Sequence, residues 1–251
     1  DIPKELLNSV NFWFHIYSKY SQFELVFFDG TDHSKVYFVQ DDRDLFQKGY
    51  SPIKIELTSE LRYKKNIQKL RAAFSNLSRN PKKSFKPDSL EYKIVKLWGR
   101  KSSSQWNNIS GEIKTQRGQK DFVIEGISRS IPYQHSIEKV FTQYNLPPEL
   151  TRIALLESSF QLEAQSKANA VGVWQFMESS GREFLTINKA KGIDERRSPI
   201  KATVAAAKLL KRHIRIVGGL YLGIISYNHG VRNLIKFKNK ITCYHHSQHF
   251  S

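Results

Sequence analysis

Residues 147–160 read PPELTRIALLESSF, and this stretch decides the fold of the C-terminal half of the chain. Pro148 suits the first turn of a helix, because the N–H that proline lacks would have no partner there. The helix that follows has four side chains at positions i, i+3, i+4 and i+7: Leu150, Ile153, Ala154 and Glu157. Glu157 therefore continues an apolar stripe, and we expect its carboxyl group to face the core side of the helix.

A carboxyl group on the apolar side of a helix suggests acid–base chemistry. Desolvation disfavours the charged form and raises the pKa, which is what a general acid working near neutral pH requires. The alternative is a glutamate at a helix end that turns to solvent or pairs with an arginine. Periodicity alone favours that alternative, and the motifs that follow Glu157 favour the acid.

The pattern from about residue 117 onward predicts helices almost throughout. Residues 136–144 have an apolar side, and Ser198-Pro199 predicts another helix start, with Ser198 as N-cap and Pro199 as the first helical residue. The small residues of the following helix imply close packing against a neighbour. Its expected buried residues are Ala202, Ala205, Ala206, Leu209, Leu210 and His213.

The N-terminal part predicts both helices and strands. We expect an amphipathic helix over residues 4–20, a β-hairpin from residues 23–28 and 35–40, and a helix over residues 56–77. Residues 79–101 are strongly basic, with a helix over 89–98, and residues 102–112 have the composition of a connector. The expected apolar side of the first helix consists of Leu6, Leu7, Val10, Phe14 and Tyr17.

The predicted fold class is therefore mainly α. An all-α domain over residues 113–251 follows a smaller α+β region over residues 1–112.

Charge and composition limit the function classes. The 251 residues carry a net charge of +17 and contain one cysteine, so an internal disulfide is excluded. No apolar run is long enough to span a membrane, and the first residues lack the pattern of a signal peptide. Residues 121–200 hold 9 basic and 10 acidic side chains, whereas residues 201–251 hold 9 basic and no acidic ones. A basic exterior around a neutral site fits a large anionic polymer whose reacting part is uncharged, better than it fits a nucleic acid.

Several motifs occur in order and at fixed spacing. They are Glu157-Ser158-Ser159-Phe160, Ser166, Gly172-Val173-Trp174-Gln175-Phe176-Met177 and Tyr227-Asn228. In this respect the chain resembles the lytic transglycosylases, which share the goose-type lysozyme fold. Further segments resemble the membrane-bound type D branch: Gln116-Arg117-Gly118-Gln119, Pro147-Pro148-Glu149-Leu150 and Asp194-Glu195-Arg196.

The resemblance implies cleavage of peptidoglycan glycan strands with one carboxyl group and no cofactor. Glu157 would protonate the oxygen between N-acetylmuramic acid and N-acetylglucosamine, and then take the proton of the muramyl C6 hydroxyl as that oxygen closes a 1,6-anhydro ring. Ordinary glycosidases need two carboxylates. A tethered internal nucleophile removes that need.

The resemblance also implies a substrate-binding set. Ser158 and Gln175 would hold the glutamate or the sugar, Ser166 would contact the substrate, and Gly172 would let the backbone approach the glycan. Trp174 and Met177 would line the groove, with a core position as the alternative for both. Tyr227 would lie beside Glu157, supported by Asn228.

Glu178 departs from the family pattern, in which proline commonly follows the methionine. Together with Glu163 it predicts extra negative charge near the groove, and so a preference for N-deacetylated glycan. A water-using lysozyme and a non-catalytic binder of anionic wall polymer or nucleic acid remain as alternatives.

Two remaining expectations concern metal and location. The run from Cys243 to His249 suggests a metal site, because it holds Cys243, His245, His246 and His249, but four ligands from one short terminal run seldom close a tetrahedral site, so we expect none. We expect a monomer acting on peptidoglycan, with no nucleic-acid partner, in the periplasm or secreted to the cell wall.

Overall fold

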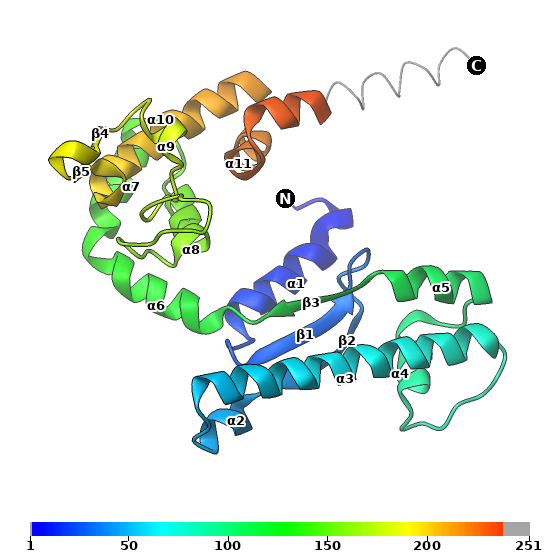
Figure 1. Cartoon of the computed structure of the whole chain (residues 1–251). Helices are drawn as coiled ribbons and strands as arrows, with labels where there is room; N and C mark the ends of the chain where they lie inside the picture. The colour runs from blue at the N-terminus through cyan, green and yellow to red at the C-terminus, as the bar shows by residue number, and fades with distance from the viewer. Residues whose placement is uncertain (1, 238–251) are drawn as a thin grey trace, which may run out of the picture. The chain divides into compact units, whose positions relative to one another are not determined.

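The computed structural model describes residues 2–237 and divides into two compact units, residues 1–123 and 124–251 (Figure 1). The predicted class is confirmed: the chain is mainly α, with a small sheet in the N-terminal unit. The sequence placed the boundary after residue 112. Strand β3 (Ile113–Arg117) lies beyond that point and pairs with β1 (Glu24–Asp29), so it belongs to the N-terminal unit.

The N-terminal unit is built on a three-stranded antiparallel sheet in the order β2-β1-β3, where β2 is Val36–Asp41. The predicted hairpin of β1 and β2 is confirmed. Side chains alternate along β1, so Leu25 and Phe27 enter one core and Val26 and Phe28 the other. Both faces of the strand are buried, which explains its continuous apolar run.

Helices cover both faces of this sheet. Helix α1 (Leu7–Ser18) packs on one face through Phe12 and Ile16. The other face is covered by α3 (Pro52–Arg79), α4 (Leu90–Trp98) and α5 (Ser103–Gly111). The unit also contains η1 (Lys4–Leu6) and α2 (Arg43–Gln47).

Two N-terminal expectations were wrong. The expected apolar side of α1 is exposed at Leu6, Leu7, Val10 and Phe14, because the core takes the opposite side, through Phe12 and Ile16. The expected connector over residues 102–112 is the helix α5. A capping box of Ser102 and Gln105 starts α5, and the buried Trp106 anchors it against Phe74, so tertiary packing outweighs its polar composition.

The C-terminal unit is centred on α10 (Pro199–Val217), with Ser198 as its N-cap and Pro199 in its first turn, as predicted. The alanine-rich side of α10 is buried, and α10 packs against α7 (Gln134–Gln143) and α11 (Leu220–His229). Helix α6 (Lys120–Ser130) runs across the boundary between the units, and η2 (Ile131–Tyr133) connects it to α7. The predicted helix after Pro147 consists of η3 (Pro148–Arg152) and α8 (Ile153–Ser158).

Residues 159–198 were expected to be largely helical, and this was wrong. Their regular elements are short: α9 (Glu178–Gly181), β4 (Ile187–Asn188), η4 (Lys189–Lys191), β5 (Ile193–Asp194) and η5 (Glu195–Arg197). Several residues of this region have positive φ, including Ser159, Asn169 and Gln175. Such backbone conformations interrupt a helix, and local hydrogen bonds and the Asp194–Arg196 pair hold the segment instead.

Candidate active site

Glu157 lies in the last turn of α8, and the backbone immediately after it fixes its position. Helix α8 ends because Ser159 has φ 49° and Phe160 has φ 53°, both in the left-handed region. Such conformations cost free energy in residues other than glycine and persist where the surroundings enforce them. Here the ring of Phe160 is 1% exposed and packs against Tyr133, with ring centroids 5.7 Å apart. The core thus holds the sharp turn that follows Glu157.

The carboxyl group of Glu157 is partly buried, as its place in the apolar stripe predicts. Burial raises its pKa above the ordinary glutamate value, and a hydrogen bond from Asn228 opposes this rise. A carboxyl group with a raised pKa holds its proton closer to neutral pH, while Asn228 stabilises the anion that remains once the proton is given up. The pair can therefore donate and recover a proton.

Tyr227 lies close enough to Glu157 for the two to interact electrostatically, and both Tyr227 and Asn228 come from α11. Burial and the negative charge of Glu157 raise the pKa of Tyr227 well above its ordinary value, so the phenol keeps its proton. Its hydroxyl donates to the carbonyl oxygen of Trp174 at 2.9 Å. The structure thus brings together Glu157, Tyr227 and Asn228 from two helices.

Ser158 and Gln175 bind backbone groups in this structure. The Ser158 hydroxyl donates to the carbonyl oxygen of Val173 at 3.0 Å, which ties α8 to the loop of residues 172–177. Gln175 has φ 47°, and its side-chain amide donates to the carbonyl oxygen of Gly172 at 2.9 Å. Both side chains therefore hold the loop beside Glu157.

Gly172 is required by the protein's own backbone. Its φ is +78°, and a Cβ atom built there would lie 2.0 Å from the carbonyl oxygen of Arg196. Arg196 is itself buried, forms an ion pair with Asp194 at 2.6 Å, and donates to the carbonyl oxygen of Phe176 at 3.2 Å. The resemblance implied an approach to the glycan, whereas the contact that the structure shows is with Arg196.

Trp174 occupies the core position that sequence left open. Its ring is 1% exposed and stacks on Phe141, and its indole N–H donates to the hydroxyl of Thr203 at 2.9 Å. Met177, at the end of the same motif, is 42% exposed. Of these two residues, Met177 is the one available to a ligand.

Ser166 and Glu178 also have partners within the protein. The Ser166 hydroxyl accepts a hydrogen bond from the backbone N–H of Ala170 at 3.0 Å, which closes a turn. Glu178 forms ion pairs with Arg182 and Lys189, each at 2.7 Å, and these cations lower its pKa to about 2.

Glu163, the second carboxylate of the expected negative patch, pairs with Arg197 at 2.6 Å. Cations therefore offset the charges of both Glu163 and Glu178. This pairing removes the reason for expecting a preference for N-deacetylated glycan.

Sequence reasoning did not assign a role to the pair His213–Ser226. The two side chains are buried, with 3.0 Å between His213 Nδ1 and Ser226 Oγ. Ser226 donates its own proton to the carbonyl oxygen of Gly223 at 2.7 Å, so it accepts from His213. This joins α10 to α11 one residue before Tyr227. The available signal was a histidine on an apolar helix face.

No group of three or more potential metal ligands occurs within residues 2–237. The run from Cys243 to His249 lies outside the described residues. Within the described part of the chain, no helix is both long and apolar enough to cross a membrane.

Residues 135–246 match the family model of the Transglycosylase SLT domain, so the predicted resemblance to lytic transglycosylases is confirmed for this region.

Over 118 residues the chain is 30% identical to membrane-bound lytic murein transglycosylase D from Escherichia coli strain K12, and equally so to that of E. coli O6:H1 strain CFT073. The aligned part is 47% of this chain and 26% of those relatives, so the chain spans about a quarter of their length. A third relative, 31% identical over 118 residues, comes from Alteromonas sp. strain M-1, and its name assigns it provisionally to tributyltin chloride resistance. That match covers 45% of this chain and 56% of the relative.

Proposed function

We propose that the protein cleaves the β-1,4 bond between N-acetylmuramic acid and N-acetylglucosamine in peptidoglycan, by ring closure and not by hydrolysis. The observation that carries the proposal is the carboxyl group of Glu157, partly buried and with a raised pKa, beside Tyr227 and Asn228. This group lies inside the segment that matches the Transglycosylase SLT domain. The names of the E. coli relatives point to the same substrate.

In the proposed reaction Glu157 acts twice. Its protonated carboxyl group gives a proton to the glycosidic oxygen as the bond from C1 to that oxygen breaks. The resulting carboxylate, which the Asn228 side chain stabilises, takes the proton of the muramyl C6 hydroxyl. That oxygen bonds to C1, which leaves a 1,6-anhydro sugar, a free 4-hydroxyl on the other product and a protonated Glu157.

One carboxyl group is enough for this reaction, because the attacking oxygen is already attached to the reacting sugar. Two-carboxylate glycosidases need a second acid free to act as base or nucleophile. Glu163 and Glu178, the other carboxylates that the sequence associates with the site, are both held in ion pairs. This pairing favours ring closure over the lysozyme-type alternative.

Tyr227 and the loop of residues 172–177 would position the acid. The Tyr227 phenol keeps its proton and bonds to Trp174, while Ser158 bonds to Val173. These two hydrogen bonds hold α8, α11 and the loop in one arrangement around the carboxyl group. Met177 offers an exposed apolar surface for a sugar. Such a protein would act on the wall outside the cytoplasm.

The test uses purified wall sacculi incubated with the wild type, with Glu157→Gln and with Glu149→Gln. Glu149 is an exposed glutamate eight positions earlier, so it controls for loss of one charge in the same segment. Soluble products are analysed by mass. We expect anhydro-muropeptides from the wild type and from Glu149→Gln, and a rate lower by about 10²-fold or more for Glu157→Gln. Products with reducing ends would instead identify a hydrolase, and no soluble product from any variant would identify a binder.

A further inference from the structure

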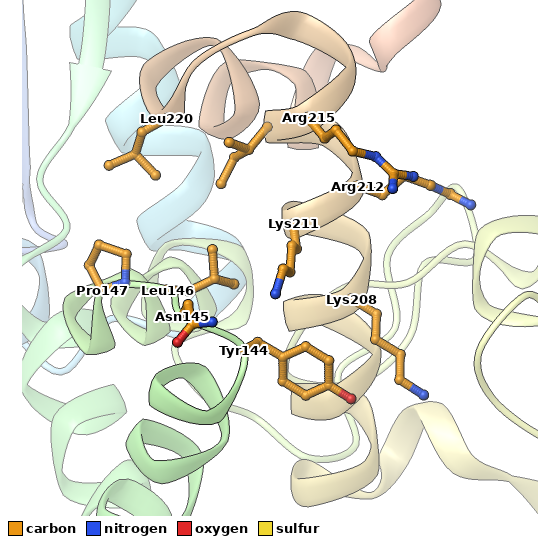
Figure 2. Close-up of a pocket in the computed structure, with 10 residues that line it drawn as sticks. Tyr144, Asn145, Leu146, Pro147, Lys208, Lys211, Arg212, Arg215 and Leu220 are labelled. Carbon is orange, nitrogen blue, oxygen red and sulfur yellow. The ribbon is translucent and has the colours of Figure 1, made fainter.

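The C-terminal unit has a second feature that the proposed reaction does not use: a groove between α10 and the loop that joins α7 to η3 (Figure 2). We call it the α10 groove, and its volume is about 650 Å³. It is lined by residues 144–147 on one side and by side chains of α10 and the start of α11 on the other. The lining residues are Tyr144, Asn145, Leu146, Pro147, Lys208, Lys211, Arg212, Ile214, Arg215 and Leu220.

The charge of this groove has one sign. Four of its lining residues are basic and none is acidic. The basic residues recur at i, i+3, i+4 and i+7 along α10, so they share one face of the helix: Lys208, Lys211, Arg212 and Arg215. Figure 2 shows Lys211 extending from α10 toward the loop that carries Asn145, whereas the Lys208 side chain extends toward the other side of α10.

Three of these cations are free to meet a ligand. Arg212 is engaged, because it pairs with Glu183 and lies over the ring of Phe184. In the described part of the chain, Lys208, Lys211 and Arg215 form no ion pair with an acidic side chain. Like charges placed side by side on a helix repel one another. A bound anion would relieve this repulsion.

The groove also has an apolar floor, which indicates more than a simple ion. Leu146 is buried, and Pro147, Ile214 and Leu220 add further apolar surface. A ligand that fits must therefore place negative charges near the row of cations and apolar groups against the floor. Along α10 the three free cations are separated by roughly 4.5 Å and 6 Å of helix rise, a spacing that suits several charges on one extended chain.

The α10 groove is distinct from the candidate active site. It contains none of Glu157, Tyr227 and Asn228. Its loop ends where η3 begins, whereas Glu157 lies in the last turn of α8, roughly 15–20 Å further along the helical segment. One extended polymer could occupy both places at once.

We propose that the α10 groove binds the carboxylate-bearing peptide chains of the wall polymer whose glycan strand Glu157 cleaves. This inference rests on the proposed function. Short peptides combine free carboxylates with small apolar side chains, which matches the two kinds of surface in the groove. A single-stranded nucleic acid would favour several aromatic faces for base stacking, and Tyr144 is the one aromatic residue among those lining the groove. The glycan would then be held at the acid and its peptides at α10.

The test measures binding without cleavage, in the Glu157→Gln background. The groove variant carries Lys208→Gln, Lys211→Gln and Arg215→Gln. The matched control carries Lys65→Gln, Lys69→Gln and Arg71→Gln on α3, where the three side chains are also exposed and the same charge is removed. Cosedimentation is measured with intact sacculi and with glycan strands from which an amidase has removed the peptides. Circular dichroism verifies folding.

We expect the groove variant to bind intact sacculi about tenfold more weakly than its parent, and the difference to shrink on peptide-free strands, because three exposed ionic contacts are lost. The control should differ from the parent by far less. Equal losses in the groove variant and the control would overturn the proposal, and so would equal losses on the two polymers. Binding of a 20-nucleotide DNA is measured as well. If the groove variant binds this DNA more weakly than its parent but binds sacculi equally well, the groove is assigned to nucleic acid. Cleavage is measured separately with Glu157 intact, so a failure of the proposed reaction is distinguishable.

Discussion

Replacing Gly172 with alanine tests whether the protein's own backbone, and not the glycan, requires glycine at this position. The φ of +78° alone costs a residue with a Cβ about 1–2 kcal/mol. The added atom would also lie 2.0 Å from the carbonyl oxygen of Arg196 and 2.9 Å from its carbonyl carbon. Both are backbone atoms, so relief requires a shift of the chain, which costs about 1–3 kcal/mol in a well-packed region. We therefore expect Gly172→Ala to lower the free energy of unfolding by about 2–5 kcal/mol.

Gly218 provides a matched control. Its φ is +80°, nearly the same as that of Gly172, but a Cβ built there has no heavy atom within 4 Å. Gly218→Ala should therefore show only the conformational cost of about 1–2 kcal/mol. The free energies of unfolding of both variants are compared in urea. Hydrogen exchange of the α10 amides reports the unfolding of the C-terminal unit. Equal losses for the two variants would refute the argument, because the contact with Arg196 would then contribute nothing.

Three further predictions concern the same unit. Glu157 has a folded-state pKa above its unfolded value, so its stabilising contribution is complete at pH values below the unfolded pKa and is lost as pH rises through the folded pKa. Glu157→Gln should therefore gain stability relative to the wild type over that pH window. A difference in melting temperature between the two proteins that does not change with pH would contradict this. Thr203→Val leaves the buried indole N–H of Trp174 without an acceptor and should cost about 1–3 kcal/mol in urea unfolding, whereas a cost near zero would mean that water replaces the hydroxyl. Arg196→Met breaks the ion pair of the buried Arg196 with the partly exposed Asp194 and should cost about 3 kcal/mol, the lower end of the range for a buried pair. The pKa of Asp194 is lowered by Arg196, so this loss should shrink as pH falls through that lowered pKa, and a loss that is constant with pH would argue against the ion pair as its cause.

The sequence predicted the elements whose signals are local. Ser198-Pro199 starts α10, the alanine-rich side of α10 is buried, and β1 and β2 form the predicted hairpin. The sequence also placed Glu157 on the apolar side of its helix. In each case the deciding information lies within a few residues: a cap, a proline, or the spacing of apolar side chains.

Predictions failed where long-range contacts decide the structure. The helix α1 presents two apolar sides, and periodicity cannot tell which one the sheet will cover. Strand β3 forms because β1 offers it a free edge, and the paired residues of β1 lie 84 to 92 positions earlier in the chain. The loop after α8 has positive φ at Gly172 and Asn169, residue types that favour it, but also at Ser159, Phe160 and Gln175, whose residue types do not signal a turn.

For the candidate site, the sequence predicted which residues lie together better than it predicted their contacts, and their catalytic role stays a prediction. The motif spacing identified Glu157, Tyr227 and Asn228, and the structure gathers them. The motif spacing did not reveal that Gly172 and Ser158 contact the protein's own backbone. Those contacts are with the carbonyl oxygens of Arg196 and Val173, and any residue type supplies a carbonyl.

The hydrogen bonds that join the 172–177 loop to α8 and α11 have a consequence for the strength of the acid. Ser158 holds Val173, and Tyr227 holds Trp174, so opening of this loop would release both neighbours of Glu157 together. Water would then reach the carboxyl group and its proton affinity would fall toward that of a free glutamate. The pKa of Glu157 thus depends on whether this loop is folded. Mild heating or low denaturant that loosens the loop should lower the pKa of Glu157 before the unit as a whole unfolds.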